Sequence, residues 1–177
     1  MTSKITHLIN RQSEETTSLK ITRFINLVLA SIITGNAIGS LTFVFPALHE
    51  LDPQAKTAAE QALTRRYLPI MRVLMPATVV SCLAVLGLMH DRRSAAFRLT
   101  LAGTAGFVGM LGVTAIELPI NRQTLEVAPE APPADWPDVR ARWEHFNRLR
   151  TLCEVIGWAC LYLGALSSER SHHRYAL

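Results

Sequence analysis

Charged residues are missing from four long stretches of this 177-residue chain. No Asp, Glu, Lys or Arg occurs in residues 24–48, 73–90, 99–116 or 155–168. The stretches also lack the polar face that a helix of a soluble bundle shows every three to four residues. A bilayer core about 30 Å thick needs roughly 20 helical residues to cross it. The missing charge therefore predicts membrane-spanning helices and disfavours a soluble four-helix bundle.

Motifs of several enzyme and binding classes are also absent. The three cysteines form no CxxC pair, so neither a zinc site nor a thioredoxin-like redox centre is indicated. There is no nucleophile elbow, no glycine-rich phosphate loop and no dinucleotide fingerprint. The histidines lack metal-ligand spacing except for His172 and His173, which we expect to lie in a solvated tail. A net charge of +4 is too modest to predict nucleic-acid binding. We therefore expect no metal, no cofactor and no nucleic-acid partner.

The four apolar segments predict an all-α protein, an integral membrane four-helix bundle in contact with the lipid bilayer. Its spans are expected at about 24–47, 67–90, 98–119 and 149–168. They form one domain, residues 24–168, between a polar N-terminal tail (1–23) and a polar C-terminal tail (169–177). The basic connection HDRRSAAFR, residues 90–98, is the clearest cytoplasmic signal. We therefore expect both termini in the cytoplasm and the protein in the inner or plasma membrane.

The two connections on the other side of the membrane are long. Residues 51–68 predict a short helix capped by Asp52. A proline-rich loop that begins at Asn121 predicts an extended strap over the mouth of the bundle. A fourth helix running from Pro137 to Ser168 is longer than the membrane requires. Its first two or three turns should therefore project from the bilayer.

All nine glycines fall inside the predicted spans. Membrane helices use small residues to bring their backbones together. Six of the glycines fall on two spans: Gly35 and Gly39 on the first, and Gly103, Gly106, Gly109 and Gly112 on the third. These faces are candidates for helix packing or for contacts in a homo-oligomer.

Polar side chains return at the ends of the spans that lie opposite the termini. They are His49 after the first span, Arg72 in the second, Glu117 and Asn121 at the end of the third, and Trp143, Asn147, Arg150 and Glu154 leading into the fourth. The last four are spaced i, i+4, i+7 and i+11, so they share one stripe of a helix. Ionisable groups at membrane depth are costly and usually face the bundle interior, either paired or lining a cavity.

Two interpretations of this polar rim remain open. One is a structural network of ion pairs that closes the bundle. The other is the polar floor of a pocket open to lipid and to the outer face, which Asn36 would extend downward. Guanidinium donors, carboxylate acceptors and an aromatic wall together suit a flat oxygenated ligand.

Two segments of the chain, ELPINRQTL (117–125) and DVRARWEHFNRLRTLCEVIGWACLYLGAL (138–166), carry a family resemblance. Three sequence features accompany the four-span layout: a proline at the end of the first span (Pro46), a P-x-N motif ending at Asn121, and a W-x-x-x-N-x-x-R-T motif from Trp143 to Thr151. Together they resemble the anthrone oxygenase-like family of small integral membrane proteins. The resemblance covers most of residues 24–168. Many members have histidine where this chain has Asn147.

The resemblance implies a membrane-embedded, cofactor-independent oxygenase that converts an anthrone-like aromatic polyketide to an anthraquinone with O2. Glu154, or alternatively Glu117, would then remove a proton from the anthrone, and Arg150 and Asn147 would stabilise the resulting enolate. Glu154 is preferred because it shares the stripe with Asn147 and Arg150. The residues implied in substrate binding are Trp143, Asn121, Glu117, Arg72, Asn36 and His49. The alternative is a non-catalytic membrane protein that binds a lipid or a quinone, or that assembles with a partner.

Overall fold

The computed structural model describes the backbone of residues 2–174 and the side chains of residues 17–168. Its elements, in chain order, are α1 (Thr2–Gly39), the π-helix η1 (Ser40–Val44), α2 (Phe45–His49), α3 (Pro53–Leu88), α4 (Ala95–Glu126) and α5 (Trp136–Arg174). No strand occurs in this part of the chain. The predicted polar tails lie largely outside the residues whose side chains are described.

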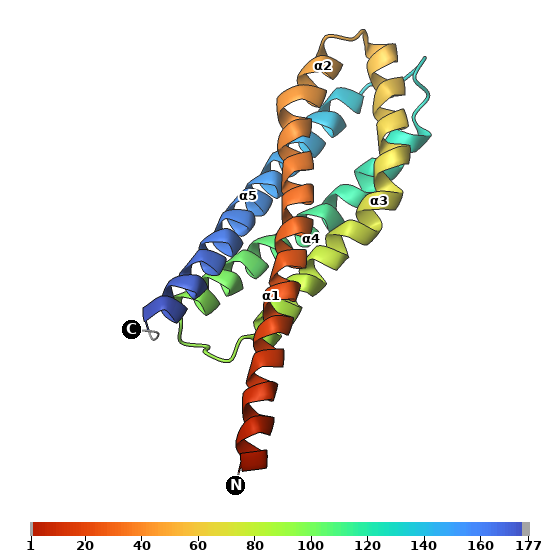
Figure 1. Ribbon diagram of the computed structural model, residues 1–177. Coiled ribbons are helices and arrows are strands. Elements are labelled where there is room, and N and C mark those ends of the chain that lie inside the picture. The colour runs from red at the N-terminus through yellow and green to blue at the C-terminus, as the bar shows by residue number, and fades with distance from the viewer. Residues whose placement is uncertain (1, 175–177) are drawn as a thin grey trace.

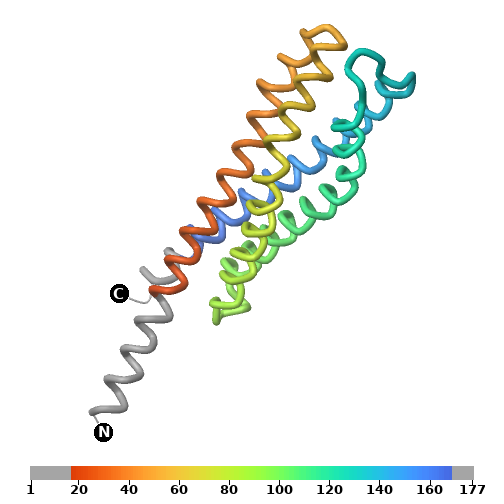
Figure 2. The backbone as a smooth tube through the Cα atoms, turned by 90° about the vertical axis from the view of Figure 1, so that its right-hand side faces the viewer, coloured from red at the N-terminus to blue at the C-terminus, as the bar shows by residue number. Residues whose placement is uncertain are grey.

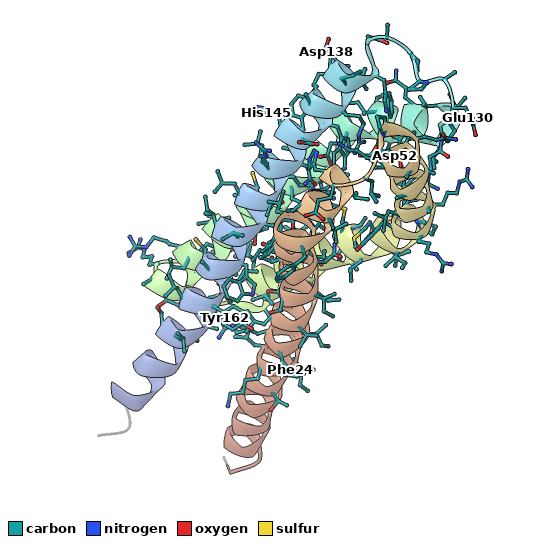
Figure 3. All side chains as sticks on the ribbon, turned by 90° about the horizontal axis from the view of Figure 1, so that it is seen from above. Phe24, Asp52, Glu130, Asp138, His145 and Tyr162 are labelled. Atoms are coloured by element: carbon teal, nitrogen blue, oxygen red, sulfur yellow. The ribbon has the colours of Figure 1, made fainter. Side chains whose placement is uncertain are left out.

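Four helical segments are long and apolar enough to cross a membrane: Thr17–His49, Pro53–Leu88, Ala95–Glu126 and Trp136–Ser168. Many of their large apolar side chains point away from the bundle, as Phe24 does at 68% exposure (Figure 3). Such surfaces suit contact with lipid better than contact with water. The predicted all-α membrane bundle is therefore confirmed, whereas its orientation and its particular membrane stay predictions.

The long helices run alternately up and down the bundle (Figure 1). The first helix packs against α3 and α5, and α4 packs against the same two helices. The α3–α4 connection lies at one end, and the α2–α3 and α4–α5 connections lie at the other, which is the upper end in Figures 1 and 2. The polar rim predicted from the sequence therefore gathers at the upper end.

Both upper connections differ from their predicted form. Asp52 caps a helix as expected, accepting hydrogen bonds from the N–H groups of Gln54 (3.1 Å) and Ala55 (3.0 Å). This helix is not a separate short one, because its backbone hydrogen bonds continue into the second span as α3. The strap is shorter than predicted because α4 continues through Pro119 to Glu126. Neighbouring helices let a membrane helix tolerate an internal proline.

An apolar core fills the middle of the bundle. Its buried members are Ala30, Ile33, Met75, Val79, Cys82, Phe107, Met110 and Leu161. They come from all four spans, so burial of this core holds the four helices together.

The glycine track of the third span is used partly within the chain. A Cβ added at Gly106 would lie 2.8 Å from both the Cys153 carbonyl oxygen and the Gly157 Cα, and one at Gly103 would meet the Gly157 carbonyl oxygen at 2.9 Å. Gly103 and Gly106 therefore allow α4 and α5 to approach closely, which is the packing role given as one alternative, whereas contact with a second copy of the chain stays a prediction. Open space surrounds the Cβ positions at Gly35, Gly39 and Gly112.

The first helix contains a π turn, and α3 and α4 contain internal prolines. The π-helical turn η1 precedes Pro46, and there the N–H of Phe45 donates to the Ser40 carbonyl. Two prolines lie inside α3, which bends near its middle in Figure 1, and Pro119 lies inside α4. Proline removes a backbone donor and bends a helix, and π turns are frequent at functional sites. The π turn and residues at or next to these prolines, namely Ser40, Pro76 and Leu118, border the cavity described next.

Candidate functional site

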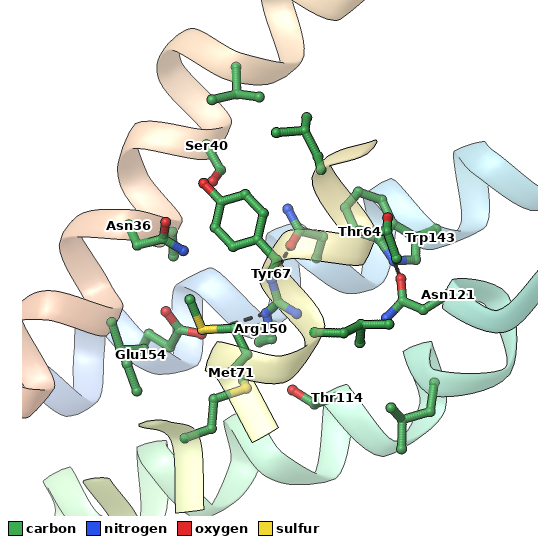
Figure 4. A pocket seen from close by; sticks show the side chains of 18 of the residues that line it. Asn36, Ser40, Thr64, Tyr67, Met71, Thr114, Asn121, Trp143, Arg150 and Glu154 are labelled. Carbon is green, nitrogen blue, oxygen red and sulfur yellow. Dashed lines mark hydrogen bonds and ion pairs between the residues drawn. The ribbon is translucent and has the colours of Figure 1, made fainter. Parts of the chain in front are cut away.

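A cavity of about 320 Å³ lies between the upper halves of the four spans (Figure 4). Much of its wall is apolar. The polar members are Asn36, Ser40, Glu60, Thr64, Tyr67, Arg72, Thr114, Asn121, Arg140, Trp143, Asn147, Arg150 and Glu154. This volume is at the lower end of the range of roughly 300–1,000 Å³ typical of small-molecule sites, which are likewise apolar with a few placed polar groups.

Arg150 is the centre of a cluster in the cavity wall, formed with Glu117, Asn147 and Glu154 and called the Arg150 cluster below. Its Nη1 donates to Glu117 Oε2 and its Nη2 to Asn147 Oδ1, each at 2.5 Å, and its Nε lies 3.6 Å from Glu154 Oε1. Three of the four residues share the α5 stripe that the sequence predicted, and Glu117 comes from α4. The two interpretations of the rim are therefore compatible, because the same residues form ion pairs and line a cavity.

The two carboxylates of the cluster have different surroundings. Glu154 lines the cavity, whereas Glu117 is 0% exposed and lies behind the wall as the partner of Arg150. Oε1 of Glu117 and Oε2 of Glu154 are both buried and accept no hydrogen bond from any described residue, but only the Glu154 oxygen belongs to a residue of the cavity wall. A buried acceptor without a donor is costly, so this oxygen is suited to take a proton or a hydrogen bond from a molecule in the cavity. Both carboxylates contact the same guanidinium, that of Arg150.

A second buried ion pair closes the upper end of the cavity. Arg140 Nη2 donates to Glu60 Oε1 at 3.0 Å, and Nη1 donates to Thr124 Oγ1 at 3.4 Å. Beside this pair, Gln61 Nε2 donates to the Val127 carbonyl oxygen at 2.6 Å. These bonds, called the outer closure below, tie α3 to α4, α5 and the loop between them.

Arg140 and Glu60 were not among the residues that the sequence singled out. Arg140 precedes Trp143 by three positions, so it extends the same stripe by one turn. Glu60 stands alone in an apolar part of the segment that was expected to be a separate interfacial helix. Helical spacing in the sequence could therefore have identified Arg140. Glu60 could be identified only by knowing that α3 continues from this segment into the second span.

Trp143 is held firmly in the cavity wall. Its Nε1 donates to Asn121 Oδ1 at 2.9 Å. The Arg140 guanidinium carbon lies 4.4 Å from the centroid of its ring, and Phe45 meets it in a T-shaped contact at 5.4 Å. Because these neighbours already contact the indole, Trp143 shapes the cavity as a rigid wall, and Asn121 orients Trp143.

His49 does not belong to this cavity, contrary to the prediction. Its Nδ1 lies 3.1 Å from Lys56 Nζ, and its Nε2 lies 3.3 Å from Glu144 Oε1 beside a separate cavity of about 120 Å³. The neighbouring Leu48 is buried and lines the main cavity. Since successive helical residues are about 100° apart, His49 is turned outward.

The other predicted binding residues, Asn36 and Arg72, both line the cavity. Asn36 faces it from the first helix (Figure 4). His145, on the side of α5 opposite the stripe, points away from the bundle (Figure 3). Within residues 17–168, no group of three or more His, Cys, Asp or Glu side chains is placed to hold a metal ion.

The site therefore combines an apolar chamber, an acceptor carboxylate and an adjacent guanidinium and amide. Such a set can remove a proton from an apolar molecule and stabilise the negative charge that results.

A family model described as anthrone oxygenase matches residues 66–160, more than half of the chain. The match begins within α3, covers all of α4 and includes the whole Arg150 cluster. Neither a search of curated proteins nor a search of solved structures finds a match to this chain. Because this family model matches more than half of the chain, the chain belongs to the anthrone oxygenase family.

Proposed function

We propose that this protein is a membrane-embedded, cofactor-independent oxygenase that converts an anthrone-like aromatic to its quinone with O2, with Glu154 as the base. The observation that supports this most is the Glu154 carboxylate in the cavity wall. One of its oxygens is buried without a donor from the described residues, and the other lies 3.6 Å from Arg150. Family membership supports the oxygenase class.

The first step is removal of a proton from the carbon between the two aromatic rings of the anthrone. The carbonyl group across the central ring acidifies this C–H bond, because the electron pair left behind delocalises onto the carbonyl oxygen. Glu154 takes the proton, and the enolate charge lies near Arg150 and Asn147. Asn147 accepts from Arg150 through Oδ1, which leaves its two N–H groups to donate to the enolate oxygen.

The second step is reaction of the enolate with oxygen. The anion gives one electron to O2, and the radical and superoxide so formed combine at the same carbon. Protonated Glu154 returns its proton to the peroxide, then removes the second hydrogen of that carbon as the O–O bond breaks. The departing hydroxide takes this proton and leaves as water. One O2 yields one carbonyl and one water, so the substrate supplies all the electrons and no other reductant is needed.

Oxygen uptake by purified protein in lipid nanodiscs, incubated with a panel of anthrones, tests this proposal. We expect protein-dependent uptake above the spontaneous oxidation in empty nanodiscs, with one quinone formed for each O2 consumed. Turnover should persist with chelators, and the protein should contain no stoichiometric iron, copper, flavin or haem. Bound copper or iron whose removal abolishes turnover would overturn the mechanism. Saturable binding of anthrones without oxygen uptake would support the non-catalytic alternative.

A further inference from the structure

The exposed part of the cavity wall is confined to one edge. Of all the residues that line the cavity, only Arg72, Pro76 and Leu118 are exposed, and the others are buried or half-buried. Arg72 and Pro76 are one turn apart on the same edge of α3, and Leu118 lies on α4. The cavity therefore opens sideways between α3 and α4, through what we call the lateral opening.

The upper end offers a ligand no comparable path. Glu60 and Arg140 form the ion pair of the outer closure, and they are only 5% and 8% exposed although both line the cavity. A molecule arriving from the aqueous side would have to separate this buried pair, which would leave charges unpaired at a cost of several kcal/mol. A molecule arriving at the lateral opening meets no such barrier.

The lateral opening faces the depth of the acyl chains. Arg72 follows Arg66 by six residues, so it lies about 9 Å further along the helix. The side chains next to Arg72 on α3 are apolar and exposed: Val73 at 71% and Ile70 at 59%. Side chains of this kind contact lipid in a membrane protein, so the opening connects the cavity with the bilayer interior.

Among the three exposed lining residues, which all belong to the described part of the chain, Arg72 alone carries a charge. It makes no hydrogen bond or ion pair with any residue whose side chain is described. A charged side chain at membrane depth usually pairs, reaches the interface or marks the path of a ligand. Because Arg72 also lines the cavity, its guanidinium can donate to an oxygen of a molecule that has entered.

We propose that the cavity is loaded from the bilayer through the lateral opening, and that Arg72 selects flat polycyclic aromatics that carry an acceptor oxygen at the end nearest the opening. The choice of a polycyclic aromatic as the ligand rests on the proposed function. The route of entry rests on which residues of the cavity wall are exposed. Binding of a quinone that cannot be oxidised further tests the route without turnover. Failure of oxygen uptake and failure of this inference are therefore separate results.

Leu118→Trp is the variant that tests the route, with Ile116→Trp as its matched control. Both add one tryptophan to the exposed side of α4, but only Leu118 lines the cavity. The protein is reconstituted in vesicles preloaded with dihydroxyanthraquinone, and binding is followed by the quenching of tryptophan fluorescence. We expect Leu118→Trp to slow association and dissociation alike by about tenfold, which corresponds to a barrier about 1.4 kcal/mol higher. The Kd should change less than either rate constant, and Ile116→Trp should match the unmodified protein.

The source of the ligand is tested by diluting the vesicles at a fixed ratio of probe to lipid. If the cavity fills from the bilayer, the association rate follows the mole fraction of probe in the membrane and not its aqueous concentration. A rate that follows the aqueous concentration would overturn the inference. Equal rates for the two tryptophan variants, or quenching that does not saturate in the unmodified protein, would also overturn it.

Arg72→Leu and Arg72→Lys test the selection of an oxygen. Arg72→Leu should weaken the binding of dihydroxyanthraquinone by about tenfold, the effect of losing one hydrogen bond to a charged donor. It should leave the binding of anthracene, which has no oxygen, unchanged. Arg72→Lys keeps a charged donor and should retain most of the affinity. The same loss for both probes, or no loss for either, would contradict the role given to Arg72.

Discussion

Replacing Glu154 with Gln removes the ionisable group from the cavity wall while keeping the shape of the side chain. Loss of a general base typically lowers the rate by about 10²–10⁴-fold, and we expect anthrone oxidation to fall within this range. Stability should change little, because Arg150 keeps its 2.5 Å bonds to Glu117 and Asn147, whereas its contact with Glu154 is 3.6 Å long. The variant should therefore fold normally and fail in turnover.

Glu117→Gln should have the opposite effect. It removes the charged acceptor that is 0% exposed and bonded to Arg150, which should destabilise the bundle by about 1–3 kcal/mol. The rate of the folded fraction should fall less than it does in Glu154→Gln, because the base in the cavity is retained. Oxygen uptake and thermal unfolding in the same detergent measure the two effects. Glu130→Gln, an exposed change of the same type, is the matched control.

The comparison has a clear refuting outcome. If Glu154→Gln oxidises anthrones at the rate of Glu130→Gln, Glu154 is not the base. If both cluster variants lose rate and stability in the same proportion, the Arg150 cluster is a structural unit without separate roles.

Gly106→Ala should destabilise the bundle by about 1–3 kcal/mol, because the new Cβ meets α5 at 2.8 Å. Gly112→Ala should leave the stability unchanged, because nothing lies within 4 Å of its Cβ. Thermal unfolding of the two variants measures the difference. Arg150→Lys keeps the charge but loses the planar fork that reaches two acceptors at once, so oxygen uptake should fall at least about tenfold. In a background without the native cysteines, Ala131→Cys should react with an impermeant thiol reagent on intact cells and Ala95→Cys only after lysis. The reverse pattern would place both termini outside.

Much of the fold could be predicted because membrane spans depend on local composition. The charge-free segments indicated four helices, and the Asp52 cap was visible from its residue type and position. The continuity of α3 was missed because hydropathy falls around Arg65 and Arg66, where the helix leaves the apolar zone. Backbone hydrogen bonds do not depend on that fall, so the helix continues through it.

The candidate site was predictable only where its residues share one helix. Arg150 and Glu154 were found from their spacing on a single stripe, and the stripe does face a cavity. Glu60 was missed because its partner, Arg140, lies 80 positions away on another helix. His49 was assigned to the cavity because its direction depends on the turns before it. One-dimensional spacing contains no information on either point.

The π-helical turn η1 (Ser40–Val44) lets the first helix change length at one place without disturbing the site. A π turn contains one residue more than an α turn, so deleting one residue there would restore an α-helix and keep the segments on either side in their orientations. Deleting one residue near Gly35 would instead rotate everything beyond it by about 100° and turn Phe45 and Leu48 away from the cavity. We therefore expect insertions and deletions among related chains to concentrate at η1. Evolution can then alter the part of the cavity wall that η1 forms with Ser40 and Val44, while the Arg150 cluster on α4 and α5 keeps its geometry.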